Sequence, residues 1–392
     1  MITKFDSLFA GHIDMDNVGY SGIAVNDRLF GNDSLSGVFD KTSKIAKTMD
    51  AGGFNTFWMA EHHFQPEGYE CIPNLIMLNV HLAHLTKNIK FGCGFNIAPM
   101  WHPLRLAEDY ATADILTNGR VIFGVGRGYH TREVETLGSN ITDQDANREE
   151  FEEAVDIIFK AFNNESFSHN GKYYTLPPEV PYRGYTLKDL TLVPRPKTLP
   201  VECWQPIQGG TERALDFMAK HGIKGILGGG VAEGGVMDSI MTGYRDALVR
   251  AGKKDAQLGE GLSVGFHYHL APTVEQGIKE AKGFFEENLK MFGPLRLHRG
   301  LTDEQIEIMG DPRRAPDGGL PNIEEAVEKK AFLTGPPELI IEQLKGVEAE
   351  YPALERIGVS HPMGAPQSVI TEQLEWFGKE VMPAFKGAVG SG

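Results

Sequence analysis

The sequence has few cysteines and no long apolar segment. Its 392 residues include three cysteines, Cys71, Cys93 and Cys203, whose wide spacing excludes a disulfide framework and a cysteine-rich metal ribbon. No segment approaches the roughly 18 consecutive apolar residues that a membrane-spanning helix needs. The first residues, MITKFDSLFAGHIDMD, carry acidic side chains where a secretory signal needs basic ones followed by an apolar run. We therefore expect a cytoplasmic protein.

Positive charge is also scarce, because 38 lysines and arginines face 53 acidic residues and leave a net charge of −15. This balance argues against nucleic acids and acidic membrane surfaces as partners, although a local basic pocket can still hold one phosphate. The hydrophobic content of 41% and the charged content of 23% are typical of a soluble globular protein with a sizeable core.

Short apolar runs alternate with amphipathic segments along the chain, a pattern typical of βαβ units and a parallel sheet. The amphipathic segments have helical periodicity, and several are bounded by proline or glycine. Eight strands in alternation with at least eight helices fit a TIM barrel better than an open sheet. The predicted strands are residues 4–11, 54–61, 89–98, 120–126, 200–207, 223–229, 262–271 and 355–363.

We expect one domain over residues 1–392, with two segments that interrupt the barrel pattern. Residues 164–198 are rich in tyrosine, proline and glycine, and we expect an excursion with short strands of its own. Residues 293–335 are charged and punctuated by proline and glycine. A segment this long without clear periodicity is usually an active-site lid or a disordered insertion.

Three alternating glycines end the fourth predicted strand, in the segment VIFGVGRGYHTREVE. A dinucleotide fingerprint needs GxGxxG in the first βαβ unit, whereas this turn follows the fourth strand and has Tyr129 where the third glycine belongs. In a barrel, the loop after a strand opens onto the catalytic face. There the guanidinium of Arg127 can bind a phosphate monoester in bidentate geometry while backbone amides donate to it.

A second candidate phosphate site lies further along the chain. Gly209, Gly210 and Thr211 stand immediately before a predicted helix, and a helix N-terminus attracts anions. Thr211 is equally consistent with an ordinary helix N-cap. Two such sites on neighbouring barrel strands together predict a single dianionic phosphate held from both sides.

Histidines at two strand ends are candidates for catalysis or metal binding. Glu61, His62 and His63 end the second predicted strand, in FWMAEHHF, where acid and imidazole groups of a barrel indicate catalysis. The alternative is that one histidine packs in the core and the other is solvated. His267 and His269 share one face of a later strand, but no HExxH motif or carboxylate set accompanies them, so we predict no metal.

Three segments stand in order and at regular spacing: FWMAEHHF, HPLRLAEDYATADILTNGR and FGVGRGYHTREVETLG. Together they resemble the bacterial luciferase-like flavin monooxygenases, especially the luciferase alpha subunit. The resemblance is densest over about residues 54–160, resumes at 200–230 and returns weakly at 354–385. It implies a TIM barrel that binds FMN in its reduced form, FMNH2.

The resemblance also implies roles for individual residues. Arg127 binds the FMN phosphate through its guanidinium, and Tyr129 binds it through its backbone amide. Gly210 and Thr211 complete the phosphate site. His62 matches the family's catalytic histidine, which acts as a base and helps to protect the flavin hydroperoxide, and a glutamate (residue 61) precedes it as in the family.

A non-prolyl cis peptide is implied at Gly94–Phe95, against the isoalloxazine ring, with Asn96 near the polar edge of that ring. The insertion at 293–335 occupies the place of a mobile loop that keeps water out. Gly126 stands where light-emitting members have a reactive cysteine, which argues against aldehyde-driven light emission. The substrate pocket is expected to be lined by the lid and by Trp58, Phe95, Met100, Trp101 and His267.

The resemblance implies a two-component monooxygenase. It takes FMNH2 from a separate flavin reductase, because no nicotinamide site is apparent, and uses O2 to oxygenate a small, partly apolar organic substrate. Relatives pair through the helices after the second and third strands, and the apolar segment PNLIMLNVHLAHL predicts a homodimer. Alternatives are a deazaflavin- or flavin-dependent dehydrogenase of the same superfamily, a non-catalytic flavin-binding protein and a zinc-dependent TIM-barrel hydrolase.

Overall fold

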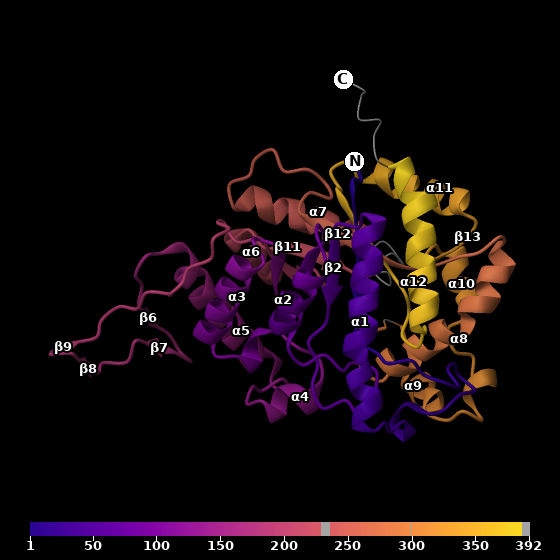
Figure 1. Ribbon diagram of the computed structural model, residues 1–392, viewed down its shortest axis with the longest axis horizontal. Helices are drawn as coiled ribbons and strands as arrows, with labels where there is room; N and C mark the ends of the chain where they lie inside the picture. The colour runs from indigo at the N-terminus through magenta and orange to yellow at the C-terminus, as the bar shows by residue number, and fades with distance from the viewer. Residues whose placement is uncertain (229–235, 299, 386–392) are drawn as a thin grey trace.

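The computed structural model describes residues 1–228, 236–298 and 300–385, which form a closed barrel of eight parallel strands (Figure 1). Each predicted strand segment contains one of these strands, which confirms the TIM barrel. Residue 229, at the end of the sixth predicted strand, lies outside the described residues. Around the barrel the strands are β1 (Lys4–Phe9), β2 (Thr56–Met59), β3 (Lys90–Cys93), β5 (Val121–Gly126), β10 (Cys203–Pro206), β11 (Lys224–Leu227), β12 (Leu262–Leu270) and β14 (Arg356–Ser360), which pairs again with β1.

Two further short strands extend the barrel. β4 (Asn96–Ile97) pairs with the end of β5, and β13 (Phe332–Gly335) pairs with the second half of β12. Residues 332–335, which the sequence analysis placed in the insertion, therefore belong to the sheet. A strand of this length is too short to show alternation in the sequence.

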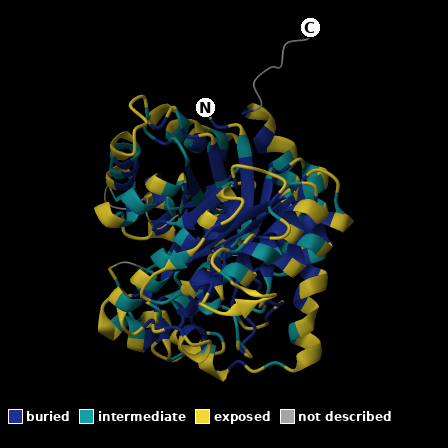
Figure 2. Cartoon of the chain, turned by 90° about the vertical axis from the view of Figure 1, so that its left-hand side faces the viewer, coloured by how far each residue is buried: buried dark blue, intermediate teal, exposed yellow. Residues whose placement is uncertain are grey.

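The predicted helices form a ring outside the strands, and their ends follow the expected signals. The Asn74 side chain accepts a hydrogen bond from the Met77 backbone N–H, and Gly53 and Gly222 adopt positive φ just after two helices. Figure 2 shows buried strands at the centre and exposed outer faces on the helices. The ring contains α1 (Asn32–Gly52), α2 (Leu75–Leu85), α3 (Pro103–Leu116), α5 (Gln144–Asn163), α6 (Glu212–His221), α7 (Val236–Arg250), α8 (Val274–Phe292), α11 (Pro337–Glu350) and α12 (Gln367–Trp376).

Two tryptophans fill the inside of the barrel. The indoles of Trp58 and Trp204 meet edge to face, with ring centroids 5.8 Å apart. Gly92 makes room for them, because a Cβ there would lie 2.0 Å from Trp58 Cε3. The Trp58 indole N–H donates to the Asp6 carboxylate over 3.0 Å, and Arg356 neutralises that carboxylate with contacts of 2.6 and 2.7 Å. Trp58 is thus a barrel-core residue.

The two predicted insertions have structure of their own. Residues 164–198, where an excursion with short strands was expected, carry the short pairs β6 (His169–Asn170) with β7 (Thr175–Leu176) and β8 (Pro181–Tyr182) with β9 (Tyr185–Thr186). This segment projects from the barrel (Figure 1). The later insertion contains α9 (Asp303–Met309) and α10 (Ile323–Glu328). Its role as a lid stays a prediction. No helix in the described part of the chain is long and apolar enough to cross a membrane.

Candidate active site

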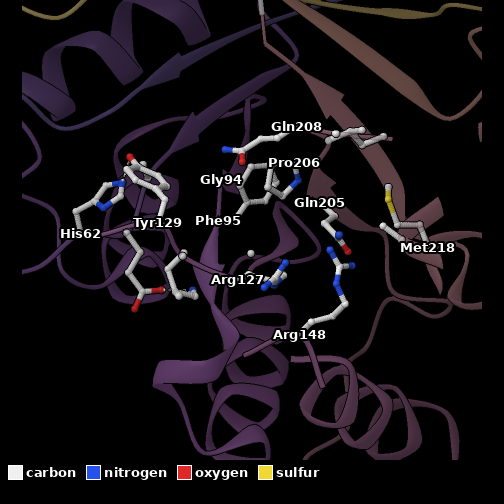
Figure 3. Close-up of a pocket in the computed structure, with 18 of the residues that line it drawn as sticks. His62, Gly94, Phe95, Arg127, Tyr129, Arg148, Gln205, Pro206, Gln208 and Met218 are labelled. Atoms are coloured by element: carbon white, nitrogen blue, oxygen red, sulfur yellow. Dashed lines mark hydrogen bonds between the residues drawn. The ribbon is translucent and has the colours of Figure 1, made fainter. Parts of the chain in front are cut away.

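A cavity of about 570 Å³ lies at the C-terminal ends of the barrel strands, where TIM-barrel enzymes carry their active sites (Figure 3). Its volume is within the range of small-molecule sites. Residues at and after the ends of β2, β3, β5 and β10 form much of its wall, together with residues of α5, α6 and α8. The predicted site residues that line it are Glu61, His62, Gly94, Phe95, Arg127, Tyr129, Gly210 and Thr211.

The peptide bond between Gly94 and Phe95 is cis, as predicted, and both residues line the middle of the cavity (Figure 3). This bend lies close against β5. A Cβ on Gly124 would come within 1.9 Å of the Cys93 carbonyl oxygen, and one on Gly126 would lie 3.3 Å from Phe95 Cβ. Two of the three alternating glycines therefore make room for the bend, a packing role that the sequence analysis had not separated from phosphate binding.

Glu61 ties the loop after β3 to the end of β2. Its carboxylate accepts hydrogen bonds from the Ile97 backbone N–H at 2.9 Å and from the Trp101 indole N–H at 2.8 Å, and His63 Nε2 is 3.2 Å away. Because Ile97 follows the cis peptide by two residues, these bonds hold the loop that carries the bend. The geometry gives Glu61 a positioning role.

Arg127 and Arg148 lie on a different side of the cavity from His62 (Figure 3). The Arg127 guanidinium donates to Asn147 Oδ1 at 2.9 Å and to the Gln144 carbonyl oxygen at 2.8 Å, which fixes its direction. Burial and the positive charge of Arg148 lower the pKa of Arg127. Two guanidiniums close enough to repel each other in this way are suited to bind a dianion.

The N-terminus of α6 borders the same cavity. Gly209, Gly210 and Thr211 line it, and Gly210 has a φ of +41°, in the left-handed region that glycine tolerates. In the described structure the Thr211 side chain makes no capping hydrogen bond. It therefore does not accept from the backbone N–H groups at the start of α6. The structure thus brings both predicted phosphate-binding segments to one cavity.

His62 is buried, and both of its ring nitrogens have partners. Nδ1 is 3.0 Å from Glu133 Oε1, whereas Nε2 is 2.9 Å from the Tyr129 hydroxyl and 3.2 Å from Glu70 Oε1. Tyr129 donates to Glu70 Oε1 at 2.7 Å, and His130 Nε2 is 2.7 Å from Glu70 Oε2. Burial acts to lower the pKa of His62, but the carboxylates of Glu70 and Glu133 outweigh it and raise that pKa above its ordinary value.

Gln205 adds a polar group to the cavity wall. Its Oε1 atom is buried and has no hydrogen-bond partner among the described residues. An unpaired buried acceptor costs about 1–3 kcal/mol, and an N–H group of a bound ligand would satisfy it. With the two arginines and the α6 N-terminus for a phosphate, and Gln205 for the polar edge of a ring, the residues present fit a flavin mononucleotide.

The other predicted site residues lie outside the lining of this cavity. Trp58 is in the barrel core, and Asn96 is fully buried with its amide donating to a backbone carbonyl of β5 at 2.9 Å. Met100 packs beside a small apolar cluster, and Trp101 is held by its bond to the positioning glutamate. His267 projects from β12, where burial, then a neighbouring histidine, lowers its pKa to about 4. Roles for these residues near the ring or the substrate stay predictions.

Sequence reasoning did not single out Arg148, Glu70, His130, Glu133 or Gln205. His130 and Glu133 belong to the segment GYHTREVE. His130 is the N-cap of α4 (Thr131–Thr136) and Glu133 lies in its first turn, so their spacing of about one helical turn was a usable signal. Arg148 lies in the first turns of α5 among many charged residues. Nothing in its local pattern separates it from its neighbours.

One group of side chains has the spacing of a metal site. Among the described residues, the ligand atoms of His62, Glu70 and His130 lie within 4.8 Å of one another. Each is already engaged in the hydrogen bonds described above, and we assign the group to hydrogen bonding. His269, a candidate zinc ligand, instead contacts Glu280 through Nε2 at 2.9 Å.

Residues 20–352 match the family model described as luciferase-like monooxygenase. The chain belongs to the luciferase-like monooxygenase family. This confirms the resemblance drawn from the three sequence segments.

Individual relatives in this family align over shorter stretches. The oxygenase component of a flavin-dependent trigonelline monooxygenase from Acinetobacter baylyi is 30% identical over 142 residues, which are 36% of this chain and 38% of that protein. The chain spans about two fifths of the length of the first curated relatives it matches.

Solved structures of the same fold cover nearly the whole chain. The oxygenating constituent of 3,6-diketocamphane monooxygenase from the CAM plasmid of Pseudomonas putida, in complex with FMN, matches with a TM-score of 0.68 and 21% identity over 98% of each chain. An F420-dependent secondary alcohol dehydrogenase matches with a TM-score of 0.65 and 14% identity, over 98% of this chain and 99% of that protein. At these identities the matches show the fold alone.

Proposed function

We propose that this protein is a flavin-dependent monooxygenase that binds FMNH2 and uses O2 to oxygenate a small, partly apolar organic substrate. When bound, the reduced flavin supplies the electrons that activate O2. A separate reductase delivers the FMNH2 in this proposal, and the relative described as an oxygenase component supports such a division.

We base the proposal on one observation: one set of residues suited to bind an anion and a second set suited to acid–base chemistry line a single cavity. Arg127, Arg148 and the α6 N-terminus form the first, and His62 with Tyr129 forms the second. The arginines bind and orient a phosphate, while the histidine side holds or moves protons. Between them lies the cis peptide at Gly94–Phe95. The apolar ring of Phe95, with other apolar residues, helps to exclude water.

Three alternatives make different demands on the same residues. A deazaflavin-dependent dehydrogenase uses the fold of the alcohol dehydrogenase above but transfers hydride without consuming O2. A non-catalytic flavin-binding protein needs the anion site and not His62. A zinc hydrolase at His267 and His269 needs a third ligand, and among the described residues no such group includes them.

The proposal is tested by mixing the protein with FMNH2 without oxygen, then adding an oxygen pulse and following the absorbance of oxidised flavin. We expect bound FMNH2 to be reoxidised more slowly than free FMNH2, and His62→Ala to shorten that delay. His169→Ala, in β6 outside the cavity wall, serves as the control and is expected to behave as wild type.

Each alternative gives a different result in this experiment. Oxidation at the same rate in wild type and His62→Ala indicates the non-catalytic flavin-binding protein. If FMNH2 does not bind but a reduced deazaflavin does, the dehydrogenase replaces the monooxygenase. Bound metal without flavin binding indicates the hydrolase.

A further inference from the structure

The hydrogen bonds around His62 define its protonation state. Glu133 accepts the His63 backbone N–H at 2.7 Å through Oε2, and its Oε1 lies 3.0 Å from His62 Nδ1. On the other side of the ring, Tyr129 donates its only proton to Glu70 Oε1, so its oxygen is left as an acceptor. Nε2 therefore faces two acceptors, the Tyr129 oxygen and Glu70 Oε1. Every polar atom around the ring is satisfied only if both nitrogens carry a proton.

A neutral His62 leaves this arrangement short of one proton. If Nε2 had no proton, Tyr129 would have to turn its hydroxyl proton from Glu70 to Nε2. Glu70 Oε1 would then face a phenol oxygen at 2.7 Å and an imidazole nitrogen at 3.2 Å, with no proton in either contact. Glu70 and Glu133 are both essentially fully buried, and buried carboxylates without a cation are costly.

The surrounding charges support the same state. Glu61 at the end of β2, Glu70 in the following loop and Glu133 in α4 all act to raise the pKa of His62 against the lowering effect of burial. His130 lies with its ring centroid 5.1 Å from that of His62. Arg132, a cation in α4, forms an ion pair with Glu67, with 2.7 Å between Arg132 Nη2 and Glu67 Oε1. His130 contacts Glu70 as well, whereas His62 contacts both carboxylates and is placed to neutralise the pair.

We propose that His62 is stored as an imidazolium between Glu133 and Glu70 and donates a proton from Nε2 to the cavity through the Tyr129 hydroxyl. Glu70 and Glu133 are positioning residues in this scheme. The charge of His62 is inferred from its hydrogen bonds and the surrounding charges and does not depend on the proposed function, whereas the donor role rests on the proposed monooxygenase function. It differs from the role of a base that the family resemblance implied for this histidine.

Such a donor has a place in the overall reaction. Substrate, O2 and FMNH2 give oxygenated substrate, FMN and water, so one oxygen atom is inserted and the other leaves as water. When the O–O bond breaks, the departing oxygen takes the electron pair. The Tyr129 hydroxyl turns its proton from Glu70 to that oxygen and takes the Nε2 proton of His62. The two protons released as FMNH2 becomes FMN restore the imidazolium and complete the water.

The charge of His62 is measured by nitrogen-15 NMR of the histidine side chains in the full-length protein without flavin. His62→Asn identifies the His62 signals by their loss. We expect imidazolium signals at neutral pH that convert to neutral signals only at higher pH. Neutral-imidazole signals for His62 at neutral pH would overturn the proposal.

Carboxylate variants test the positioning residues. Glu133→Gln and Glu70→Gln each remove a negative charge beside the ring, so the midpoint of the His62 titration is expected to fall by roughly 1 unit or more. Glu150→Gln is the matched control, because Glu150 is a partly buried carboxylate that accepts from Ser139 and lies outside the cavity wall. A titration unchanged by both test variants contradicts the assignment.

Turnover then tests the direction of proton transfer. We expect His62→Asn and Tyr129→Phe to lower the rate of oxygenation by about 100-fold or more, the usual effect of losing a general acid. The falling limb of the pH–rate profile is expected to move to lower pH in Glu133→Gln. Wild-type rates in His62→Asn or Tyr129→Phe refute the donor path. Failure to bind FMNH2 refutes the proposed function, and it is detected separately from the NMR result.

Discussion

Arg127 and Arg148 line one cavity together, although Arg127 follows β5 and Arg148 lies in α5 (Figure 3). Their proximity shows in their electrostatics, because Arg148 is the largest cause after burial that lowers the pKa of Arg127. The carboxylate of Glu152 offsets the positive charge of the two arginines only in part, because it pairs with Arg213 at 2.7 Å and lies 4.0 Å from Arg148. In the proposed complex, the phosphate of FMN supplies the negative charge that this arrangement lacks.

Removing either arginine is expected to weaken the binding of FMN and to leave the binding of riboflavin nearly unchanged, because riboflavin has no phosphate. A charge-assisted hydrogen bond contributes about 1.5–3 kcal/mol, so Arg148→Gln should raise the Kd for FMN by roughly 10- to 100-fold. Fluorescence titration measures both ligands. Arg105→Gln, an exposed arginine of α3, is the control. An Arg148→Gln variant that weakens both ligands equally would show a structural role instead.

Loss of the Glu61 carboxylate is expected to destabilise the fold. Glu61→Ala leaves the Ile97 N–H and the Trp101 indole N–H without their acceptor, at a cost of about 1–3 kcal/mol each. Trp101→Phe removes one donor and leaves Glu61 bonded to Ile97, so we expect a smaller effect. Thermal unfolding compares the two variants. Equal Tm values for wild type and Glu61→Ala would contradict the anchoring role.

Acid is expected to destabilise the protein through buried histidines with lowered pKa values, among them His267, His298 and His361. Burial is the main cause in each, and it lowers the pKa of His267 and His298 to about 4 and that of His361 to about 3. In the unfolded chain these groups titrate near the ordinary value of about 6.5. Unfolding therefore takes up protons as the pH falls from about 6.5 towards 4, and the free energy of unfolding decreases over that range.

This pH dependence is measured by thermal unfolding at several pH values within that window. His361→Gln removes one of the titrating groups, so its Tm should fall less steeply with acid than that of wild type. A wild-type Tm that does not change between about pH 6.5 and 4 would contradict the folded-state pKa values.

The predicted homodimer has a surface that a single substitution can test. Apolar side chains on α2 and α3 are exposed, with Met77 at 72% and Leu116 at 57%. If these helices pair with a second copy, Met77→Glu buries a charge in the interface, and we expect a shift to monomer size in gel filtration. Val249→Glu, an exposed position on α7, is the matched control. A wild-type protein that elutes as a monomer refutes the dimer.

The barrel was predictable from the sequence because each strand is a short apolar run between helical segments. The cis bond at Gly94–Phe95 was reached only through the family resemblance, since no local pattern marks it. The glycines of β5 looked alike in the sequence, but the structure separates them. Gly124 makes room for the Cys93 carbonyl, whereas Gly126 lines the cavity beside Phe95.

The candidate site was harder to predict, because its contacts join residues that lie far apart in the sequence. His62 meets Glu133 across 71 positions, and Glu70 meets His130 across 60. The sequence shows which side chains have suitable chemistry, and only the closed barrel shows which of them meet. For that reason His62 was identified and its two carboxylate partners were not.

Flavin binding to the wild-type protein is the most direct test of the central claim that this cavity holds a flavin phosphate. Reduced FMN, reduced riboflavin and a reduced deazaflavin coenzyme are titrated without oxygen, and the Kd of each is measured. We expect FMN to bind most tightly, with a preference over riboflavin of roughly 100-fold from the charge-assisted bonds to its phosphate. Equal Kd values for FMN and riboflavin, or tighter binding of the deazaflavin coenzyme, would contradict the account.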